Sequence, residues 1–322
     1  MAGAGPATSV VVSTYDQGRW ADVEACLESL RTQVTAPREV ILVVDHNPEL
    51  LERARSAFSD VLVIPNQRPR GLAGARNAGI SSASGEIVAF IDDDARAEPD
   101  WLRELEACFA EASTVGVGGA LLPRWEASPA RWIPHEFYWV FGCSYAGLPD
   151  ELAPVRNPIG ANMAVRASVL ELVGGFREGG EGDGDAPREL RERGVVRAAG
   201  NLPDDTDLAI RVKQRIADAV WLYQPTARVL HTVTRERTTP GYFIRRCYEE
   251  GVGKANLSRH VGSGEGLSSE RRHLARVLPA GFLRGLVGPL RGDFAGPLRS
   301  LAIVIGLAVV AAGFAAGKLT RR

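Results

Sequence analysis

Short apolar runs alternate with longer amphipathic stretches over the first hundred residues of the chain. The runs are rich in β-branched residues and lie at residues 9–14, 39–45, 61–65 and 86–92. Stretches such as RWADVEACLESLRTQ lie between them and have the periodicity of helices. Strands that are apolar on both faces and alternate with helices are typical of a parallel sheet covered on both sides. The pattern therefore predicts an α/β fold.

Beyond residue 101 the pattern becomes mixed. VGVGGAL (115–121) predicts a strand, and GANMAVRASVLELVGGF (160–176) predicts a short strand followed by a helix. PDDTDLAIRVKQ has helical periodicity, and AVWLYQPTARVLHT predicts two short strands on either side of Pro225.

Composition adds three points to this picture. The chain has 322 residues, 45% of them hydrophobic, which is ample for a core. Its net charge of −1 gives no reason to expect nucleic acid as a partner. The four cysteines are far apart and form no CxxC pair, so they are expected to be small core residues.

Polar residues gather where the predicted strands end. Thr14 and Tyr15 follow the first run, Asp45 ends the second, and the fourth is followed by further acids. In parallel α/β sheets, ligands bind beyond the carboxyl ends of the strands. These residues are therefore candidates for a binding site.

Three adjacent aspartates, Asp92, Asp93 and Asp94, stand where the fourth run ends. Their charges repel one another, so the cluster lowers stability unless a cation or hydrogen-bond donors meet it. On extended backbone the first and third side chains share a face, so Asp92 and Asp94 can reach one ligand together. Such oxygen ligands suit Mg²⁺ or Mn²⁺ with phosphate oxygens in the shell. The alternative interpretation is a solvated turn or a helix N-cap.

A glycine-rich segment, GLAGARNAG, precedes the fourth run. Gly71 and Gly74 permit a tight backbone, and Arg76 follows at the start of a predicted helix, where free N–H groups favour anions. The segment is not GxGxxG and does not follow the first strand, so it is no dinucleotide fingerprint. Small residues that pack a helix on a sheet are the alternative.

Further polar groups stand at the ends of later elements. Asp204, Asp205 and Asp207 in PDDTDL either cap a helix, or one of them supplies a general base for an acceptor hydroxyl. His231 in VLHT is either a structural residue or a ligand. Arg245 belongs to a basic string that either binds a diphosphate or forms a solvated surface near lipid headgroups.

The C-terminal end of the chain is apolar. Residues 301–317, LAIVIGLAVVAAGFAAG, carry no charge, and as a helix they would span about 25 Å, near the lower limit for crossing a bilayer. Six arginines are interleaved with apolar residues between 271 and 299, which suits a surface resting on anionic lipid. We predict membrane attachment by a helix that crosses the bilayer or lies at its interface. A helix packed on the domain is the alternative.

The motifs follow one another in one order: VVVSTYD, VILVVDHN, GLAGARNAG, IVAFIDDDA, GANMAVRASVLELVGGF, PDDTDLAIRV and VLHT. This order resembles the family-2 glycosyltransferases of the GT-A fold, over roughly residues 8–255, and the basic stretch and tail look like a membrane-associated bacterial subgroup. The resemblance implies a Rossmann-like, mostly parallel sheet with helices on both faces. It also implies a division into a catalytic domain (1–255, with a nucleotide-binding half at 8–122 and an acceptor half at 123–255), a basic amphipathic linker (256–300) and an apolar helix (301–318).

The resemblance implies roles for single residues as well. Asp94 would be the main ligand of Mg²⁺ or Mn²⁺, with His231 as a further contact. PDDTDL matches the acidic pair of the family, commonly Glu-Asp, which places the catalytic base at Asp205. Substrate and nucleotide contacts would come from Thr14, Tyr15, Asp45, Arg76, Asp92, Asp93, Asn162, Asp204 and Arg245.

The function implied by the resemblance is an inverting, metal-dependent glycosyltransferase. It would move a sugar from a nucleotide-diphosphate sugar to a hydroxyl of a glycan, a lipid-linked or a small-molecule acceptor. It would work at the cytoplasmic face of the cell membrane. Two alternatives stay open: a sugar nucleotidyltransferase, which would need a glycine-rich basic loop directly after the first strand, and a catalytically inactive module that binds nucleotide sugars.

Overall fold

The computed structural model describes residues 6–128, 130–178, 204–260 and 273–319, so residues 261–272 of the predicted linker lie outside it. The strands are β1 (Thr8–Thr14), β2 (Glu39–Val44), β3 (Leu62–Pro65), β4 (Ile87–Asp92), β5 (Ala95–Ala97), β6 (Thr114–Trp125), β7 (Ala153–Val155), β8 (Asn162–Arg166) and β9 (Val220–Val233). The α-helices are α1 (Trp20–Arg31), α2 (Pro48–Ala57), α3 (Leu72–Ser82), α4 (Trp101–Glu106), α5 (Ala167–Val173), α7 (Asp204–Arg215), α8 (Pro240–His260), α11 (Leu278–Val287) and α12 (Gly296–Leu319). Short helical turns are η1 (Gln17–Arg19), η2 (Ala107–Ala110), η3 (His135–Phe141), η4 (Arg235–Thr238), η5 (His273–Val277) and η6 (Gly288–Arg291).

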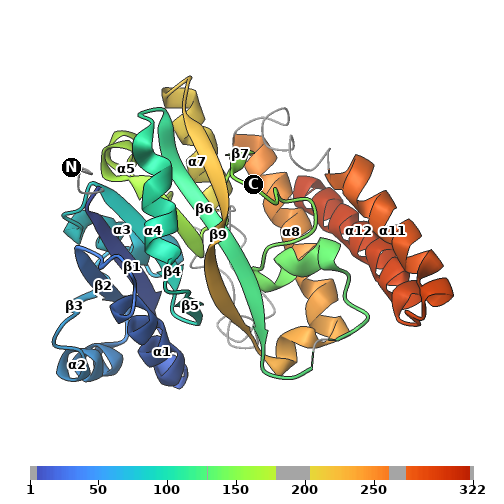
Figure 1. Cartoon of the computed structure of the whole chain (residues 1–322), viewed down its shortest axis with the longest axis horizontal. Helices are drawn as coiled ribbons and strands as arrows, with labels where there is room; N and C mark the ends of the chain where they lie inside the picture. Colours follow the sequence, from blue (N-terminus) through green and yellow to red (C-terminus); the bar gives the residue numbers. More distant parts are fainter. Residues whose placement is uncertain (1–5, 129, 179–203, 261–272, 320–322) are drawn as a thin grey trace. The chain divides into compact units, whose positions relative to one another are not determined.

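The described strands form one sheet in the order β3-β2-β1-β4-β8-β6-β9-β5, with β7 against β9 (Figure 1). β1 pairs in parallel with β2 and β4, and β2 pairs in parallel with β3. The pairings of β8 with β4 and β6, and of β9 with β5 and β7, are antiparallel. The α/β prediction is confirmed, and the parallel part of the sheet is the part that the four apolar runs predicted.

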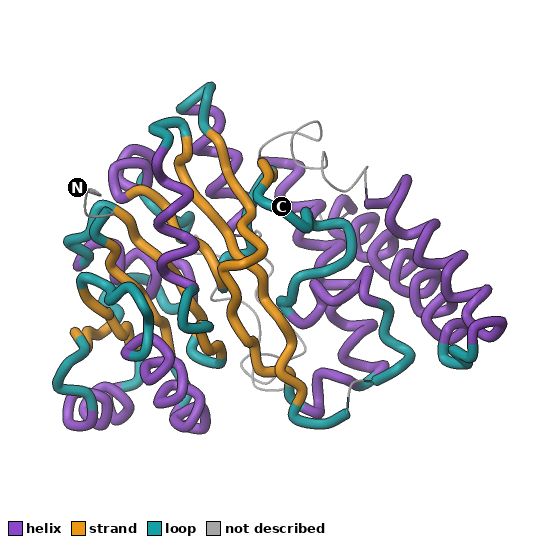
Figure 2. Tube along the Cα trace, in the orientation of Figure 1, coloured by secondary structure: helices purple, strands orange, loops and turns teal. Residues whose placement is uncertain are grey.

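The chain divides into two compact units. The first contains residues 1–122, 149–182 and 204–231, and the second contains residues 123–148, 183–203 and 232–322. Figure 2 shows strands with helices between them along the N-terminal part of the chain, and helices almost alone along its C-terminal part.

The first unit has a hydrophobic core on each face of its sheet. Val10 and Val12 of β1 belong to one core with residues of α1 and α2, while Val11 belongs to the other with residues of α3, α5 and α7. Successive residues of a strand point to opposite faces, so a strand with helices on both sides has to be apolar at every position. This explains why these runs are continuous rather than alternating.

The prediction of two strands around Pro225 is wrong, because β9 runs without a break from Val220 to Val233. Proline lacks the N–H that a strand ladder needs. Pro225 lies between the two stretches of β9 that pair with β7 and β5, which cover residues 221–223 and 229–231. Its missing donor therefore falls where neither of these neighbours is paired.

Asn162 at the start of β8 is fully buried, and its amide joins three parts of the first unit. Its Oδ1 accepts from Trp101 Nε1 at 2.7 Å, and its Nδ2 donates to Ala120 O at 3.0 Å and Ala227 O at 2.9 Å. The side chain is thus occupied by the scaffold, and its predicted contact with a substrate stays a prediction.

Asn162→Ala should lower the free energy of unfolding by about 3 kcal/mol, because it leaves buried donors and acceptors on Trp101 and two strands unpaired. Urea unfolding followed by circular dichroism measures the loss. A variant with unchanged stability and weakened substrate binding would instead assign Asn162 to the substrate.

The second unit has an aromatic core of its own. Phe137 and Phe141 of η3, Phe243 of α8 and Ile303 of α12 are buried together. All four cysteines of the chain are free and buried, as expected. Within the described residues, one helix, α12, is long and apolar enough to cross a membrane by length and composition.

Candidate functional site

The carboxyl ends of β1, β2 and β4 meet at one edge of the sheet. The parallel register sets Ser13 opposite Asp92 and Thr14 opposite Val44, and the N–H of Asp45 continues the ladder by donating to Thr14 O at 2.7 Å. The polar residues that end these three strands are therefore neighbours, as the strand pattern predicted.

Asp45 fixes the loop that leads into α3. Its Oδ1 accepts from Asn66 Nδ2 at 2.6 Å, and its Oδ2 accepts from the backbone N–H of Gly71 at 3.0 Å. Gly71 has φ of 127°, a conformation that favours glycine. A Cβ at Gly74 would lie 2.0 Å from Pro69 O, so this close approach also requires glycine. The glycines of GLAGARNAG thus shape a turn held by Asp45.

A chain of hydrogen bonds through Arg76 and Gly160 connects Asp92 to Asp205. Arg76, which is buried, donates from Nη2 to Asp92 Oδ1 at 3.4 Å and to Gly160 O at 3.0 Å. The N–H of Gly160 donates to Asp205 Oδ2 at 3.1 Å. A Cβ at residue 160 would lie 2.8 Å from Arg76 Nη1, so a larger residue there would shift the guanidinium. The predicted base and the aspartate cluster therefore share one site in the first unit.

The helix α7, which carries Asp205, is held in place by hydrogen bonds of Arg211, one to two turns further along the helix. Arg211 donates to Asp207 Oδ2 at 2.7 Å, to Val173 O at 2.9 Å and to Gly175 O at 2.7 Å. Asp207 is fully buried. These bonds tie the first turns of α7 to the end of α5, so the position of Asp205 is set by the scaffold. Asp204, the first residue of α7, is half-buried.

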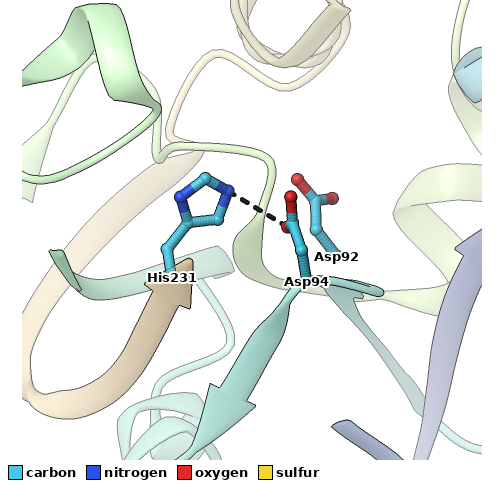
Figure 3. A group of neighbouring side chains, drawn as sticks. All are labelled: Asp92, Asp94 and His231. Atoms are coloured by element: carbon cyan, nitrogen blue, oxygen red, sulfur yellow. Dashed lines mark ion pairs between the residues drawn. The ribbon is translucent and has the colours of Figure 1, made fainter. Parts of the chain in front are cut away.

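Asp92, Asp94 and His231 form a group that can hold a metal ion, with ligand atoms all within 4.8 Å of one another (Figure 3). β5 pairs with β9 so that Ala95 lies opposite His231, and this register brings the imidazole to Asp94. His231 Nε2 lies 3.1 Å from Asp94 Oδ1. Two carboxylates and one imidazole are a donor set that suits Mn²⁺, whereas Mg²⁺ prefers oxygen alone. The residues therefore fit a divalent ion.

Arg19, which sequence reasoning missed as a site residue, meets the other side of the aspartate cluster. Its Nη1 lies 2.6 Å from Asp93 Oδ1, and its Nη2 lies 3.5 Å from Asp94 Oδ2. The guanidinium also lies over the ring of Tyr15, 5.4 Å from the centroid, and that ring is exposed. Arg19 supplies part of the positive charge that lets three aspartates stand side by side.

Asp93 is turned away from the metal-binding group toward Arg19. Burial raises the pKa of Asp93 to about 6, although the Arg19 charge acts to lower it. Because the pKa is higher in the folded chain than in the unfolded one, protonation of Asp93 favours folding. This contribution is complete below about pH 4 and is lost as the pH rises through 6.

Asp93→Asn removes this titration. The stability of the wild type relative to the variant should therefore fall as the pH rises from 4 to 7, by about 3 kcal/mol at most. Urea unfolding of both proteins in a chelating buffer across this range measures the difference. A difference that does not change with pH would contradict the buried, ionisable Asp93.

Arg245 lies on α8 in the second unit. It sits over the ring of Tyr242, 5.4 Å from the centroid, and its Nε lies 3.9 Å from Glu249 Oε1. These partners belong to its own unit, so its predicted diphosphate contact stays a prediction. The roles assigned to Thr14, Tyr15 and Asp45 in binding a nucleotide stay predictions as well.

Known proteins are similar to this chain in sequence and in fold. Residues 9–174 match the family model described as Glycosyl transferase family 2. A glucosyl-dolichyl phosphate glucuronosyltransferase from Haloferax volcanii is 32% identical over 250 residues, which cover 76% of this chain and 75% of the relative.

Two solved structures have a similar fold. The mannosyltransferase PcManGT from Pyrobaculum calidifontis, in complex with GDP-Man and Mn²⁺, has a TM-score of 0.60 at 19% identity, over 97% of this chain and 88% of that one. GalNAc-T7, solved with UDP, GalNAc and Mn²⁺, has a TM-score of 0.52 at 15% identity, over 84% of this chain and 54% of that one.

Proposed function

Because the chain belongs to glycosyl transferase family 2, we propose that it transfers a sugar, with inversion, from a nucleotide-diphosphate sugar to a hydroxyl of a lipid-linked acceptor. The predicted family, the GT-A fold and glycosyltransferase activity are confirmed by the family match, the relative and the two similar structures. The inversion, the acceptor and the roles of single residues are our proposal.

The observation that carries the proposal is the connection of Asp205 to Asp92 through Gly160 and Arg76, beside a metal-binding group. Asp92, Asp94 and His231 would hold Mn²⁺. An ion bound there would neutralise the charge that develops on the departing diphosphate. Arg19 adds positive charge at the same edge.

Asp205 is proposed as the general base. An acceptor hydroxyl has too high a pKa to attack unaided, so a carboxylate takes its proton as the new bond forms. The Gly160 N–H and the hydrogen bonds of Arg211 hold the carboxylate in one place. Attack from the side opposite the leaving diphosphate inverts the anomeric carbon.

The lipid-linked acceptor is proposed from two observations. The Haloferax volcanii relative is named for an acceptor that carries glucose on dolichyl phosphate. The second unit of this chain ends in a helix apolar enough to enter a membrane. Donor nucleotides come from the cytoplasm, so we place the enzyme at the cytoplasmic face of the cell membrane.

A screen of radiolabelled nucleotide-sugar donors with Mn²⁺ and a short polyprenyl-phosphate glucose tests the proposal. We expect one donor to give a labelled lipid product with an inverted anomeric carbon by NMR. Pyrophosphate release from a sugar phosphate and a nucleoside triphosphate would point to the nucleotidyltransferase instead. Tight donor binding without transfer to lipid, sugar or water would point to the inactive module.

A further inference from the structure

The second unit ends in a helical hairpin made of α11, η6 and α12, and the turn of this hairpin is strongly apolar. Leu290 is 88% exposed and Phe294 is 81% exposed, with the turn glycine Gly292 between them. Leu283 and Leu286 of α11 and Leu298 and Leu301 of α12 are exposed apolar side chains on its two arms. Exposing so many apolar side chains to water is unfavourable, so we expect the hairpin to contact an apolar environment.

The two arms of the hairpin are held together by backbone contacts at small residues. A Cβ at Gly285 would lie 2.2 Å from Ser300 Oγ, and one at Gly296 would lie 2.3 Å from Gly285 O. Ser300 Oγ donates to Phe282 O at 2.8 Å. The close packing of α11 and α12 makes the hairpin one rigid element. The two helices would therefore enter an apolar environment together.

α12 is packed along α8, as the neighbouring orange and red helices show (Figure 1), from Gly306, where a Cβ would lie 3.0 Å from Phe243 Cζ, to Gly317. A Cβ at Gly251 of α8 would lie 2.1 Å from Val310 O, and one at Gly313 of α12 would lie 2.2 Å from Tyr248 O. A Cβ at Gly317 would lie 2.8 Å from Ala255 Cβ. The two backbones thus touch along residues 310–317 of α12.

The stretch of α8 that packs along α12 also carries charged side chains, which pair with one another. Arg246 Nη1 lies 2.9 Å from Glu249 Oε2, and Lys254 Nζ lies 3.3 Å from Glu250 Oε1. Charged groups are costly in the hydrocarbon core of a bilayer. A helix that crosses a bilayer needs about 20 residues in that core, and residues 306–317 of α12 are bound to a helix whose charged side chains disfavour that environment.

The exposed side chains of α12 become smaller from its N-terminal half to its C-terminal half. Large apolar side chains are exposed from Leu298 to Leu307, whereas the exposed positions between 308 and 316 are alanines. Apart from Leu319 at the end of α12, the large exposed apolar side chains of the hairpin are therefore concentrated at its turn and in the adjoining halves of its two arms.

The charges on the hairpin fit an anionic lipid surface. Residues 278–319 contain four cationic side chains and one acid: Arg284, Arg291, Arg299, Lys318 and Asp293. Arg284 and Arg291 are exposed beside the apolar turn. Apolar side chains flanked by arginines are typical of segments that lie in the interface of an anionic membrane.

From these observations we infer that the α11–α12 hairpin inserts into one leaflet of an anionic phospholipid bilayer and that α12 does not cross it. The inference rests on the membrane attachment proposed above and is independent of the transfer chemistry. It assigns Leu290 and Phe294 to the hydrocarbon and Leu319 to the same side of the membrane as the first unit.

Flotation of the full-length protein with vesicles of phosphatidylcholine and phosphatidylglycerol tests the insertion. The double variant Leu290→Glu/Phe294→Glu should reduce the bound fraction at least tenfold, while Leu172→Glu, at an exposed leucine of α5, should leave it unchanged. Vesicles of phosphatidylcholine alone should bind less of the wild type. Equal binding by the double variant, or equal binding to neutral vesicles, would overturn the inserted turn or its anionic preference.

Labelling with a membrane-impermeant maleimide tests the topology, since the four native cysteines are buried. In sealed vesicles, Leu319→Cys and Val34→Cys should both react from outside; these positions are 81% and 61% exposed. Reaction of the Val34 variant alone, with the Leu319 variant reacting only after detergent, would show that α12 crosses. Donor turnover in detergent, measured on the same samples, separates a failure of attachment from a failure of the proposed activity.

Discussion

Asp205→Asn should lower kcat by about a thousandfold, because the variant keeps the shape of the side chain and loses the group that takes the acceptor proton. Donor binding should change little, since the amide Oδ can still accept from the Gly160 N–H. Single-turnover transfer with saturating donor measures the chemical step, and calorimetry with the donor and Mn²⁺ measures binding. The loss should therefore appear in kcat and not in the donor dissociation constant.

Asp204→Asn is the matched control, because Asp204 is the adjacent acid of the same pair. It should retain most of the activity, since Asp205 and not Asp204 accepts the hydrogen bond from Gly160. If Asp204→Asn is the inactive variant while Asp205→Asn transfers normally, the two roles are reversed. If both variants transfer normally, no acid of PDDTDL is the base.

The parts of this site that were predictable from sequence are those on long, regular elements. The apolar runs predicted β1, β2 and β4, and parallel pairing then places Asp45 and Asp92 at one edge. Asp92 and Asp94 do come together as predicted, but the assumed extended backbone is wrong, because Asp93 and Asp94 form the turn between β4 and β5. His231 could be suspected only from its place in the order of motifs, because the three-residue strand β5 that sets its register has no pattern of its own.

Arg19 and Gly160 could not be predicted in this way. Arg19 is one of many arginines in the chain, and its pairing with Asp93 depends on how the turn η1 is placed after β1. Gly160 matters because both its N–H and its C=O are used, by Asp205 and Arg76 respectively. Such roles come from tertiary distances rather than from residue type. The hairpin could not be predicted either, because the apolar sequence of residues 301–317 does not show which face of the helix packs against α8.

Asp94→Asn should abolish the dependence on Mn²⁺ and lower kcat/KM by about a thousandfold, which corresponds to roughly 4 kcal/mol of lost electrostatic stabilisation. Of the three proposed ligands, Asp94 is the one that contacts both His231, at 3.1 Å, and Arg19, at 3.5 Å. Its charge therefore acts on the ion and on the surrounding cations together. Donor turnover at increasing Mn²⁺, after removal of metal by a chelator, measures the effect.

A thermal unfolding series separates loss of the ion from loss of the fold. An ion that binds only the folded chain raises Tm with concentration, so Mn²⁺ should raise the Tm of the wild type and not that of Asp94→Asn. Asp218→Asn, at an exposed acid in the turn between α7 and β9, should respond like the wild type. A Tm of Asp94→Asn that still rises with Mn²⁺ would place the ion elsewhere. In that case the pairing of β5 with β9 would serve to bury an Asp–His contact rather than to form a metal site.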